Sequence, residues 1–233
     1  MTIEPGPLLA SGRDGDIFEF GPGLVLRRAK SGRVIEGEAR VIAYAREHGY
    51  PAPEIHEVRA GGTEIVMQRL EGPMMMDAML RRPWQMGRYA RLLADLHDRL
   101  HVIPAPDWLK PVDDGDRLVH GDLHPMNVML TASGPVVIDW TNAVRADALT
   151  DVALTIVLLT CPRMPGSSIV NVAATPARAH LARVFAARYK GRALDERLDF
   201  AARMKALDAN LTAEEVAACE RLAARARQRL PRS

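Results

Sequence analysis

The most constraining feature of this 233-residue sequence is a set of polar residues within two nearby, largely apolar segments near its middle. Val119–Leu130 reads VHGDLHPMNVML, and Val136–Trp140 reads VVIDW. The polar residues of interest in these segments are His120, Asp122, Asn127 and Asp139. Because apolar residues flank each of them, the pattern predicts a polar loop that leads into a buried β-hairpin.

The spacing of these polar residues suits one kind of chemistry. Asp122 and Asn127 lie on one predicted loop, and a strand, a tight turn and a second strand bring Asp139 back beside Asn127. Phosphoryl transfer needs a carboxylate that orients the acceptor hydroxyl and takes its proton. It also needs oxygen ligands, such as an amide and a second carboxylate, that hold Mg²⁺ against the phosphates. The alternative is a polar loop before a hairpin, with a buried aspartate satisfied by hydrogen bonds.

The string HGDLHPMN with the following IDW resembles the aminoglycoside phosphotransferase and choline kinase family, whose fold is similar to that of protein kinases. The resemblance covers about Leu8 to Ala153. It implies that Asp122 is the catalytic base or orients the hydroxyl, and that Asn127 and Asp139 bind the metal. It also implies that His120 supports the loop by hydrogen bonding; an ordinary packed histidine is the alternative.

Two further segments match this family. Arg145–Ala153 reads RADALTDVA and resembles its GDPxxDLA segment, which implies that Asp151 braces the catalytic loop. Leu92–His97 reads LLADLH and resembles a helix usual in the family, in which His97 has a structural role.

The first third of the chain reads as short strands with turns, plus one helix. The strands are expected at Asp16–Phe20, Gly23–Arg28, Ile55–Val58 and Thr63–Gln68, and the helix at Ile35–His48. Ala10–Phe20 lies where the family has a phosphate-covering hairpin. Gly12 and Gly15 would let backbone N–H groups approach the phosphates, although a plain β-turn explains them equally well.

The family places a cation at the end of the next strand, paired with a helix glutamate. These positions fall on Arg27 and Glu38, and the expected pair would hold the nucleotide phosphates. Arginine replaces the usual lysine, but its guanidinium is always charged and can bind two phosphate oxygens. Arg28 and Lys30 are the alternative cations, and surface charge beside a strand is the alternative role.

Met67–Leu70 resembles the hinge that presents backbone groups to the adenine edge, which makes Gln68 and Leu70 candidate nucleotide contacts. Trp140 is expected to pack beneath the metal-binding loop. The Met74–Met76 run suits core packing better than an adaptable pocket.

The remaining sequence is mostly helical. Trp84–Leu100 carries apolar residues at helical spacing, and Thr212 with Glu215 forms a capping box that starts the last helix. That helix carries Arg221, Arg225, Arg227 and Arg229. Because no aromatic residues accompany these arginines, a solvated face is favoured over a surface for nucleic acid or membrane.

Composition excludes several classes of protein. The net charge is only +2, which does not favour general binding to nucleic acid. Cys161 and Cys219 lie far apart in the sequence, so we expect reduced thiols and a cytoplasmic protein. The N-terminus lacks the pattern of a signal peptide, and the longest apolar run, Val152–Cys161, is too short to span a bilayer.

We therefore expect a two-lobed, kinase-like α+β fold, with a nucleotide-binding lobe at residues 1–70 and a helical lobe at 71–233. The expected activity is Mg²⁺-dependent transfer of the γ-phosphate of ATP or GTP to a small-molecule hydroxyl, such as that of an antibiotic, a sugar or an amino alcohol. A regulatory nucleotide-binding module without turnover and a protein kinase are the alternatives. Residues 141–233 hold nine Asp or Glu and fifteen Lys or Arg, which favours a neutral or weakly charged acceptor.

Overall fold

The computed structural model describes residues 4–12, 14–161, 168–189, 191–207 and 211–230. It divides into two compact units. The first holds Met1–Met74 and Met126–Ala143, and the second holds Met75–Pro125 and Val144–Ser233. The division at residue 70 stays a prediction. The sequence did not indicate, however, that the hairpin after the catalytic loop groups with the N-terminal sheet.

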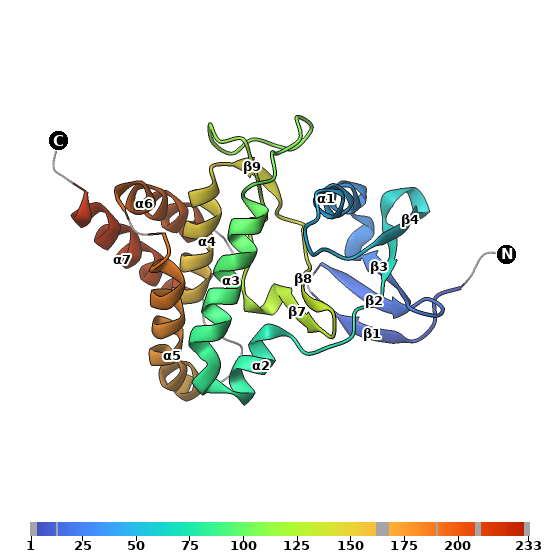
Figure 1. Cartoon of the computed structure of the whole chain (residues 1–233), viewed down its shortest axis with the longest axis horizontal. Coiled ribbons are helices and arrows are strands. Elements are labelled where there is room, and N and C mark those ends of the chain that lie inside the picture. Colours follow the sequence, from blue (N-terminus) through green and yellow to red (C-terminus); the bar gives the residue numbers. More distant parts are fainter. Residues whose placement is uncertain (1–3, 13, 162–167, 190, 208–210, 231–233) are drawn as a thin grey trace. The chain divides into compact units, whose positions relative to one another are not determined.

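The first unit is built on a five-stranded antiparallel sheet in the order β1-β2-β3-β5-β4 (Figure 1). Its strands are β1 (Leu8–Ser11), β2 (Gly15–Glu19), β3 (Leu24–Ala29), β4 (Ile55–Arg59) and β5 (Glu64–Gln68). The helix α1 (Glu36–Glu47) follows β3 and a short 3₁₀ turn. The four strands and the helix predicted from the sequence are therefore present, and β1 is an additional edge strand.

Alternation along β3 and β5 places apolar side chains on both faces of this sheet. Val25, Ile65 and Met67 pack with residues at the start of α1 in one buried cluster. Leu26 and Val66 belong to a second buried cluster with Phe20. The two central strands are therefore buried on both faces, which fixes their register.

A β-hairpin completes the first unit. Its strands, β7 (Val128–Thr131) and β8 (Gly134–Val137), pair around Ala132 and Ser133. The amide of Leu130 donates to Pro73 O at 2.9 Å, so the chain leaving the sheet runs along β7. Gly72 has a φ of 144°, and an added Cβ would lie 2.1 Å from Leu130 O, so only glycine allows this close approach.

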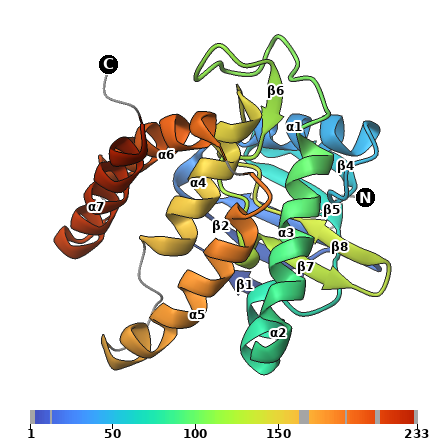
Figure 2. The ribbon, with the colours of Figure 1, turned by 60° about the vertical axis from the view of Figure 1, so that its left-hand side comes forward.

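The second unit is mainly helical (Figure 2). Its helices are α2 (Met75–Arg81), α3 (Met86–Leu100), α4 (Ala148–Thr160), α5 (Ser168–Ala186), α6 (Arg192–Ala206) and α7 (Ala213–Arg229). A two-stranded sheet of β6 (Arg117–Val119) and β9 (Val144–Ala146) flanks the catalytic loop. The helix α5 packs against both α3 and α4, and α4 and α7 both contact α6. The predicted α+β organisation is confirmed.

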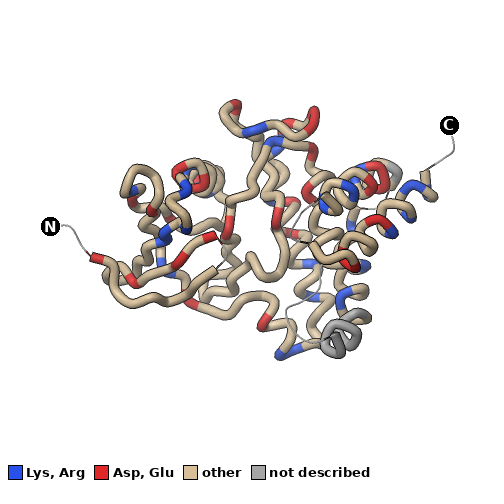
Figure 3. Tube along the Cα trace, turned by 180° about the vertical axis from the view of Figure 1, so that it is seen from behind, with Lys and Arg blue, Asp and Glu red and all other residues tan. Residues whose placement is uncertain are grey.

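The basic face of the last helix is partly neutralised by carboxylates of α6. The capping box of Thr212 and Glu215 is present. Arg227 and Arg229 each lie 3.3 Å from a carboxylate on α6. Both helices carry acidic as well as basic residues (Figure 3). Two of the four arginines of this helix are therefore paired with carboxylates of α6, and the predicted solvated face stays a prediction. None of the helices within the described residues has the length and apolar character required to cross a membrane.

Candidate functional site

The first unit brings Arg27 and Glu38 together, as the sequence predicted. Arg27 Nη1 lies 2.7 Å from Glu38 Oε1, and both side chains are largely buried, with 12% and 4% of their surfaces exposed. Arg27 comes from β3 and Glu38 from α1, so the pair links the sheet to its helix. Glu38 Oε1 receives no well-aligned hydrogen bond from the described residues, so we regard the contact as an ion pair governed by charge.

Asp139 and Thr141 extend this pair into a small polar cluster. Arg27 Nη2 lies 3.8 Å from Asp139 Oδ1. The hydroxyl of Thr141 lies 3.1 Å from Glu38 Oε2 and 3.0 Å from Asp139 Oδ1. Asp139 adopts a φ of 62°, a left-handed conformation that is uncommon outside glycine. Strained backbone of this kind is concentrated at functional sites, because only the surrounding structure can maintain it.

Burial and nearby charge set the ionisation of Glu38. Removal of its carboxylate from water raises the pKa of Glu38 above its ordinary value. The Arg27 guanidinium opposes this rise, while the Asp139 carboxylate adds to it. An additional positive group near Glu38 would therefore favour its ionised form.

Asn127 and Asp139 are the proposed metal ligands, and the hairpin places their backbones close together. The amide of Ile138, next to Asp139, donates to Asn127 O at 2.9 Å. One carboxylate and one amide oxygen fit Mg²⁺, which keeps several waters and binds substrate phosphates with few protein ligands. Within the described residues, no group of three or more His, Cys, Asp or Glu could hold a metal ion. These residues fit a shared Mg²⁺–nucleotide site better than an all-protein metal cage.

The alternative cations in the first unit are engaged elsewhere. Arg28 Nε lies 2.7 Å from Glu64 Oε1 and its guanidinium covers the ring of Phe18. Lys30 Nζ donates to Gly12 O at 2.7 Å and lies 3.4 Å from Asp16. Arg27 is therefore the cation that the structure places beside Glu38 and Asp139.

The other candidate nucleotide residues have mixed outcomes. The amide of Gly12 donates to Gly15 O at 2.9 Å, so this N–H serves the hairpin turn. A Cβ on Gly15 would lie 2.7 Å from Arg28 O, which explains the glycine by strand packing. Gln68 ends β5 and pairs through its backbone with Glu54, and Leu70 follows two residues later. Nucleotide contacts by these four residues stay predictions.

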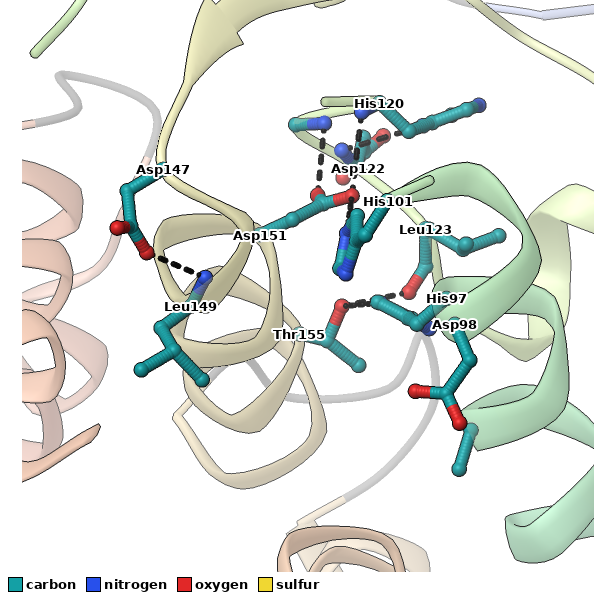
Figure 4. Close-up of polar contacts among 12 residues, drawn as sticks. His97, Asp98, His101, His120, Asp122, Leu123, Asp147, Leu149, Asp151 and Thr155 are labelled. Carbon is teal, nitrogen blue, oxygen red and sulfur yellow. Dashed lines mark hydrogen bonds and ion pairs between the residues drawn. The ribbon is translucent and has the colours of Figure 1, made fainter. Parts of the chain in front are cut away.

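In the second unit, Asp151 holds the loop that carries Asp122 (Figure 4). Its carboxylate accepts hydrogen bonds from the amides of His120 at 3.2 Å and Gly121 at 3.0 Å. The ring Nδ1 of His120 accepts from the amide of Asp122 at 3.2 Å. Asp151 therefore braces the loop through two backbone hydrogen bonds, and the supporting role of His120 stays a prediction. Asp122 itself has a quarter of its side chain exposed, and His124 Nε2 lies 3.5 Å from its Oδ1.

Two histidines at the C-terminal end of α3, His97 within the helix and His101 directly after it, complete this buried network. His101 Nε2 lies 3.1 Å from Asp151 Oδ2, and His97 Nε2 lies 2.8 Å from Thr155 Oγ. Burial alone would raise the pKa of Asp151, but the hydrogen bond from His101 and the charge interactions with the neighbouring histidines outweigh it. The pKa of Asp151 therefore lies below its ordinary value, and burial lowers that of His97 to about 4.

The low pKa of His97 predicts acid sensitivity. Its ordinary pKa is 6.5 and its folded pKa is about 4, so between these values the unfolded chain binds a proton that the folded chain does not. The free energy of unfolding should therefore fall as pH drops from 6.5 to 4, by an amount on the order of 3 kcal/mol. Chemical denaturation at several pH values measures this loss. His97→Gln should remove this part of the pH dependence, whereas His56→Gln, at an exposed histidine of β4, should keep it. An unaltered profile in His97→Gln would contradict the assignment.

A cavity of about 390 Å³ lies beside the first turn of α4. It is lined by Asp147, Leu149, Ala193, Glu196, Arg197 and Phe200. Arg197 lies 3.1 Å from Asp113, 3.4 Å from Asp114 and 3.6 Å from Asp147. Asp113, Asp114 and Asp147 therefore already have a guanidinium partner.

Sequence reasoning missed four residues of these networks. Thr141, His101 and Thr155 each have a partner at least 50 residues away in the sequence, as in the contact between Thr155 and His97 with a separation of 58. His124, by contrast, lies inside the quoted motif, two residues after Asp122. Its position beside a candidate catalytic carboxylate was the available signal.

Comparison with known proteins identifies the family. Residues 81–200, more than half of the 233-residue chain, match the phosphotransferase enzyme family (APH). The match includes the whole segment from His97 to Asp151 described above. No curated protein sequence matches this chain significantly.

Solved structures share the fold. A thermostable mutant of aminoglycoside phosphotransferase APH(4)-Ia, in complex with AMP-PNP and hygromycin B, matches with a TM-score of 0.64 at 17% identity, over 97% of this chain and 94% of that chain. The streptomycin–ATP–APH(2″)-IIa complex matches with a TM-score of 0.58 at 17% identity, over 85% and 83%. A choline/ethanolamine kinase family protein from Mesorhizobium loti matches with a TM-score of 0.55 at 16% identity, over 96% and 87%.

These likenesses confirm the predicted kinase-like fold, and the family match covers the loop, the helix α3 and the brace at Asp151. The chain therefore belongs to the phosphotransferase enzyme family.

Proposed function

We propose that this phosphotransferase transfers the γ-phosphoryl group of ATP or GTP to a hydroxyl group of a small molecule, with Asp122 as its catalytic carboxylate. The observation that carries the proposal is the arrangement of the catalytic loop. Asp122 is partly exposed, while the residues before it are fixed to Asp151 by two backbone hydrogen bonds. A reactive carboxylate on a rigid loop is what positional catalysis requires.

In the proposed reaction, the acceptor oxygen attacks the γ-phosphorus and the bond to the β-phosphate oxygen breaks. Asp122 orients the hydroxyl and accepts its proton, and the nucleoside diphosphate leaves. Arg27, held by Glu38, would bind the α- or β-phosphate. Asn127 and Asp139 would hold Mg²⁺, which neutralises negative charge on the phosphates when bound.

The acceptor class follows from charge. A polycationic acceptor needs unpaired carboxylates, because several ammonium groups must be paired when they leave water. In the second unit, Arg197 already lies within 4 Å of three aspartates around the cavity. Asp113 also accepts hydrogen bonds from Thr150 and from the amides of Gly115 and Asp147. These contacts support a neutral or weakly charged acceptor, such as a macrolide-like, nucleoside-like or simple sugar compound.

A screen of nucleoside diphosphate release tests the function. MgATP and MgGTP are supplied with cationic acceptors (kanamycin, hygromycin B, choline) and with neutral ones (a macrolide, a nucleoside, a hexose). We expect acceptor-dependent release with at least one neutral compound, and its absence in Asp122→Asn. Turnover of the cationic antibiotics alone, at kcat/KM above roughly 10⁴ M⁻¹s⁻¹, would contradict the acceptor class. Phosphorylation of generic protein substrates instead would indicate a protein kinase.

The proposed role of Arg27 in phosphate binding leads to a separate prediction about nucleotide affinity. Arg27→Ala should weaken nucleotide binding by about tenfold or more, since a hydrogen bond to a charged group contributes roughly 1.5–3 kcal/mol. Arg27→Lys should keep part of the affinity, because it retains the charge and loses the two-pronged geometry. Titration calorimetry with MgATP measures both.

Arg28→Ala is the matched control, since this neighbour on β3 pairs with Glu64 instead. It should leave the affinity for MgATP unchanged. Normal binding by Arg27→Ala would remove Arg27 from the nucleotide site.

A further inference from the structure

Two polar contacts connect the C-terminal end of α3 to α4 (Figure 4). We call each of these side-chain contacts a rung. His97 Nε2 lies 2.8 Å from Thr155 Oγ, and His101 Nε2 lies 3.1 Å from Asp151 Oδ2. His101 caps α3 in an αR conformation that continues the helical turn, so His97 and His101 lie on one face, and Asp151 and Thr155 do so on α4. His97 pairs with the later α4 residue and His101 with the earlier one, so the helices run in opposite directions across the rungs.

The α4 residue of each rung also forms hydrogen bonds with the backbone of the catalytic loop. Asp151 binds the loop before Asp122, and Thr155 binds it after Asp122. The Asp151 carboxylate accepts hydrogen bonds from the amides of His120 and Gly121, which precede Asp122. The Thr155 hydroxyl donates to the carbonyl oxygen of Leu123, the residue directly after Asp122, at 2.8 Å. The loop is therefore held on both sides of the residue proposed to act on the acceptor.

Burial makes the rung at Thr155 costly to break. His97 and Thr155 have no exposed surface, and neither has Leu123. Water therefore cannot easily replace a lost hydrogen bond, and a buried carbonyl without a donor is strongly disfavoured. Leu123 O would have to find another donor by moving, and the loop would move with it.

The hydrogens of this rung have a defined order. Leu123 O can only accept, so the single hydroxyl hydrogen of Thr155 points toward it, and Thr155 Oγ accepts from His97 Nε2. His97 Nδ1 lies 2.8 Å from Leu93 O, which also only accepts. A neutral His97 carries one ring hydrogen, so it donates either to Thr155 Oγ or to Leu93 O, and only the first choice leaves the Thr155 hydroxyl hydrogen for Leu123 O.

We propose that His97 and Thr155 are positioning residues, which set the orientation of Asp122 through the carbonyl of Leu123. The inference rests on the proposed role of Asp122. It assigns these residues an effect on the chemical step in addition to core packing, because a small displacement of a catalytic group lowers the reaction rate strongly. Neither side chain touches the acceptor or the nucleotide in this proposal.

Thr155→Val and Thr155→Ser test the inference as a matched pair. Valine has a similar shape but no hydroxyl, whereas serine keeps the donor. Thr155→Val should lower kcat about tenfold to a hundredfold, with the acceptor KM and the affinity for MgATP unchanged. Thr155→Ser should restore most of kcat. The probe is ADP release from MgATP, with the acceptor found in the screen or with water as the acceptor.

Amide hydrogen exchange supplies a readout that needs no turnover. Exchange in the peptide covering residues 118–124 should be faster in Thr155→Val than in wild type, and near wild type in Thr155→Ser. Cys219→Ala, at a buried residue of α7, is the control for general loss of packing, and it should leave this peptide unaffected.

The outcomes separate the inference from the proposed function. Unchanged exchange in Thr155→Val, or a fall in kcat that Thr155→Ser does not reverse, would overturn the positioning role even if Asp122→Asn is inactive. Full activity of Asp122→Asn would instead overturn the proposed function. Faster exchange together with the loss of kcat, both reversed by serine, would support the inference.

Discussion

Asp122→Asn should lower kcat by at least about a hundredfold, the range for loss of a positioned general base. Asparagine keeps the size of the side chain and cannot accept the acceptor proton as a carboxylate does. The amide of residue 122 would still donate to His120 Nδ1, so the loop should keep its conformation. Steady-state kinetics with the best acceptor from the screen measures the change.

Binding data distinguish this effect from damage to the fold. The affinity of Asp122→Asn for MgATP should equal that of wild type, because the carboxylate acts on the acceptor. Its Tm should also be close to that of wild type, since a quarter of the side chain is exposed and asparagine has nearly the same shape. A kcat within about tenfold of wild type would show that Asp122 is not the general base.

Asp139→Ala should abolish the strengthening of nucleotide binding by Mg²⁺. The carboxylate is the charged member of the proposed ligand pair, and an amide oxygen alone is a weak ligand for this ion. Titration calorimetry with ATP, in the presence and absence of Mg²⁺, measures the difference. In the absence of Mg²⁺, the substitution should weaken ATP binding less than it does in the presence of Mg²⁺. The reason is that loss of Asp139 removes a negative charge that lies 3.8 Å from Arg27.

The backbone at Asp139 requires a second variant. Its φ of 62° is tolerated better by asparagine than by alanine, so Asp139→Asn removes the charge with less strain. Both variants should lose the metal dependence. Glu54→Ala, at an exposed carboxylate paired with Arg46, is the control and should keep it. A metal dependence that survives in both Asp139 variants would exclude Asp139 as a ligand.

Much of the first unit was predictable because its signals are local. The GPG turn between β2 and β3, the alternation along β5 and the glycine after α1 all act over a few residues. The ion pair of Arg27 and Glu38 spans strand and helix, and the resemblance to a family supplied it. The buried Trp140, with its ring nitrogen donating to Val137 O, also lies where the sequence placed it.

The remaining features depend on contacts between distant segments. β6 and β9 are three residues each, too short for a periodic signal, and they pair across the catalytic loop. Thr141 and Thr155 are not distinguished from other threonines in the sequence, since nothing near them indicates which carboxylate or carbonyl their hydroxyls bind. The glycines at 12 and 15 suggested phosphate binding, and the structure shows a turn and close strand packing that also require them.

The division of the chain has a consequence for engineering. Neither unit is one continuous stretch, since Met126–Ala143 belongs with the N-terminal sheet although it follows the catalytic loop. A fragment that ends at Met74 lacks the hairpin that packs along its last residues, and a chimaera joined there would combine a sheet from one parent with a hairpin from another. Recombination between relatives should therefore exchange both segments together, with junctions at three places in the sequence.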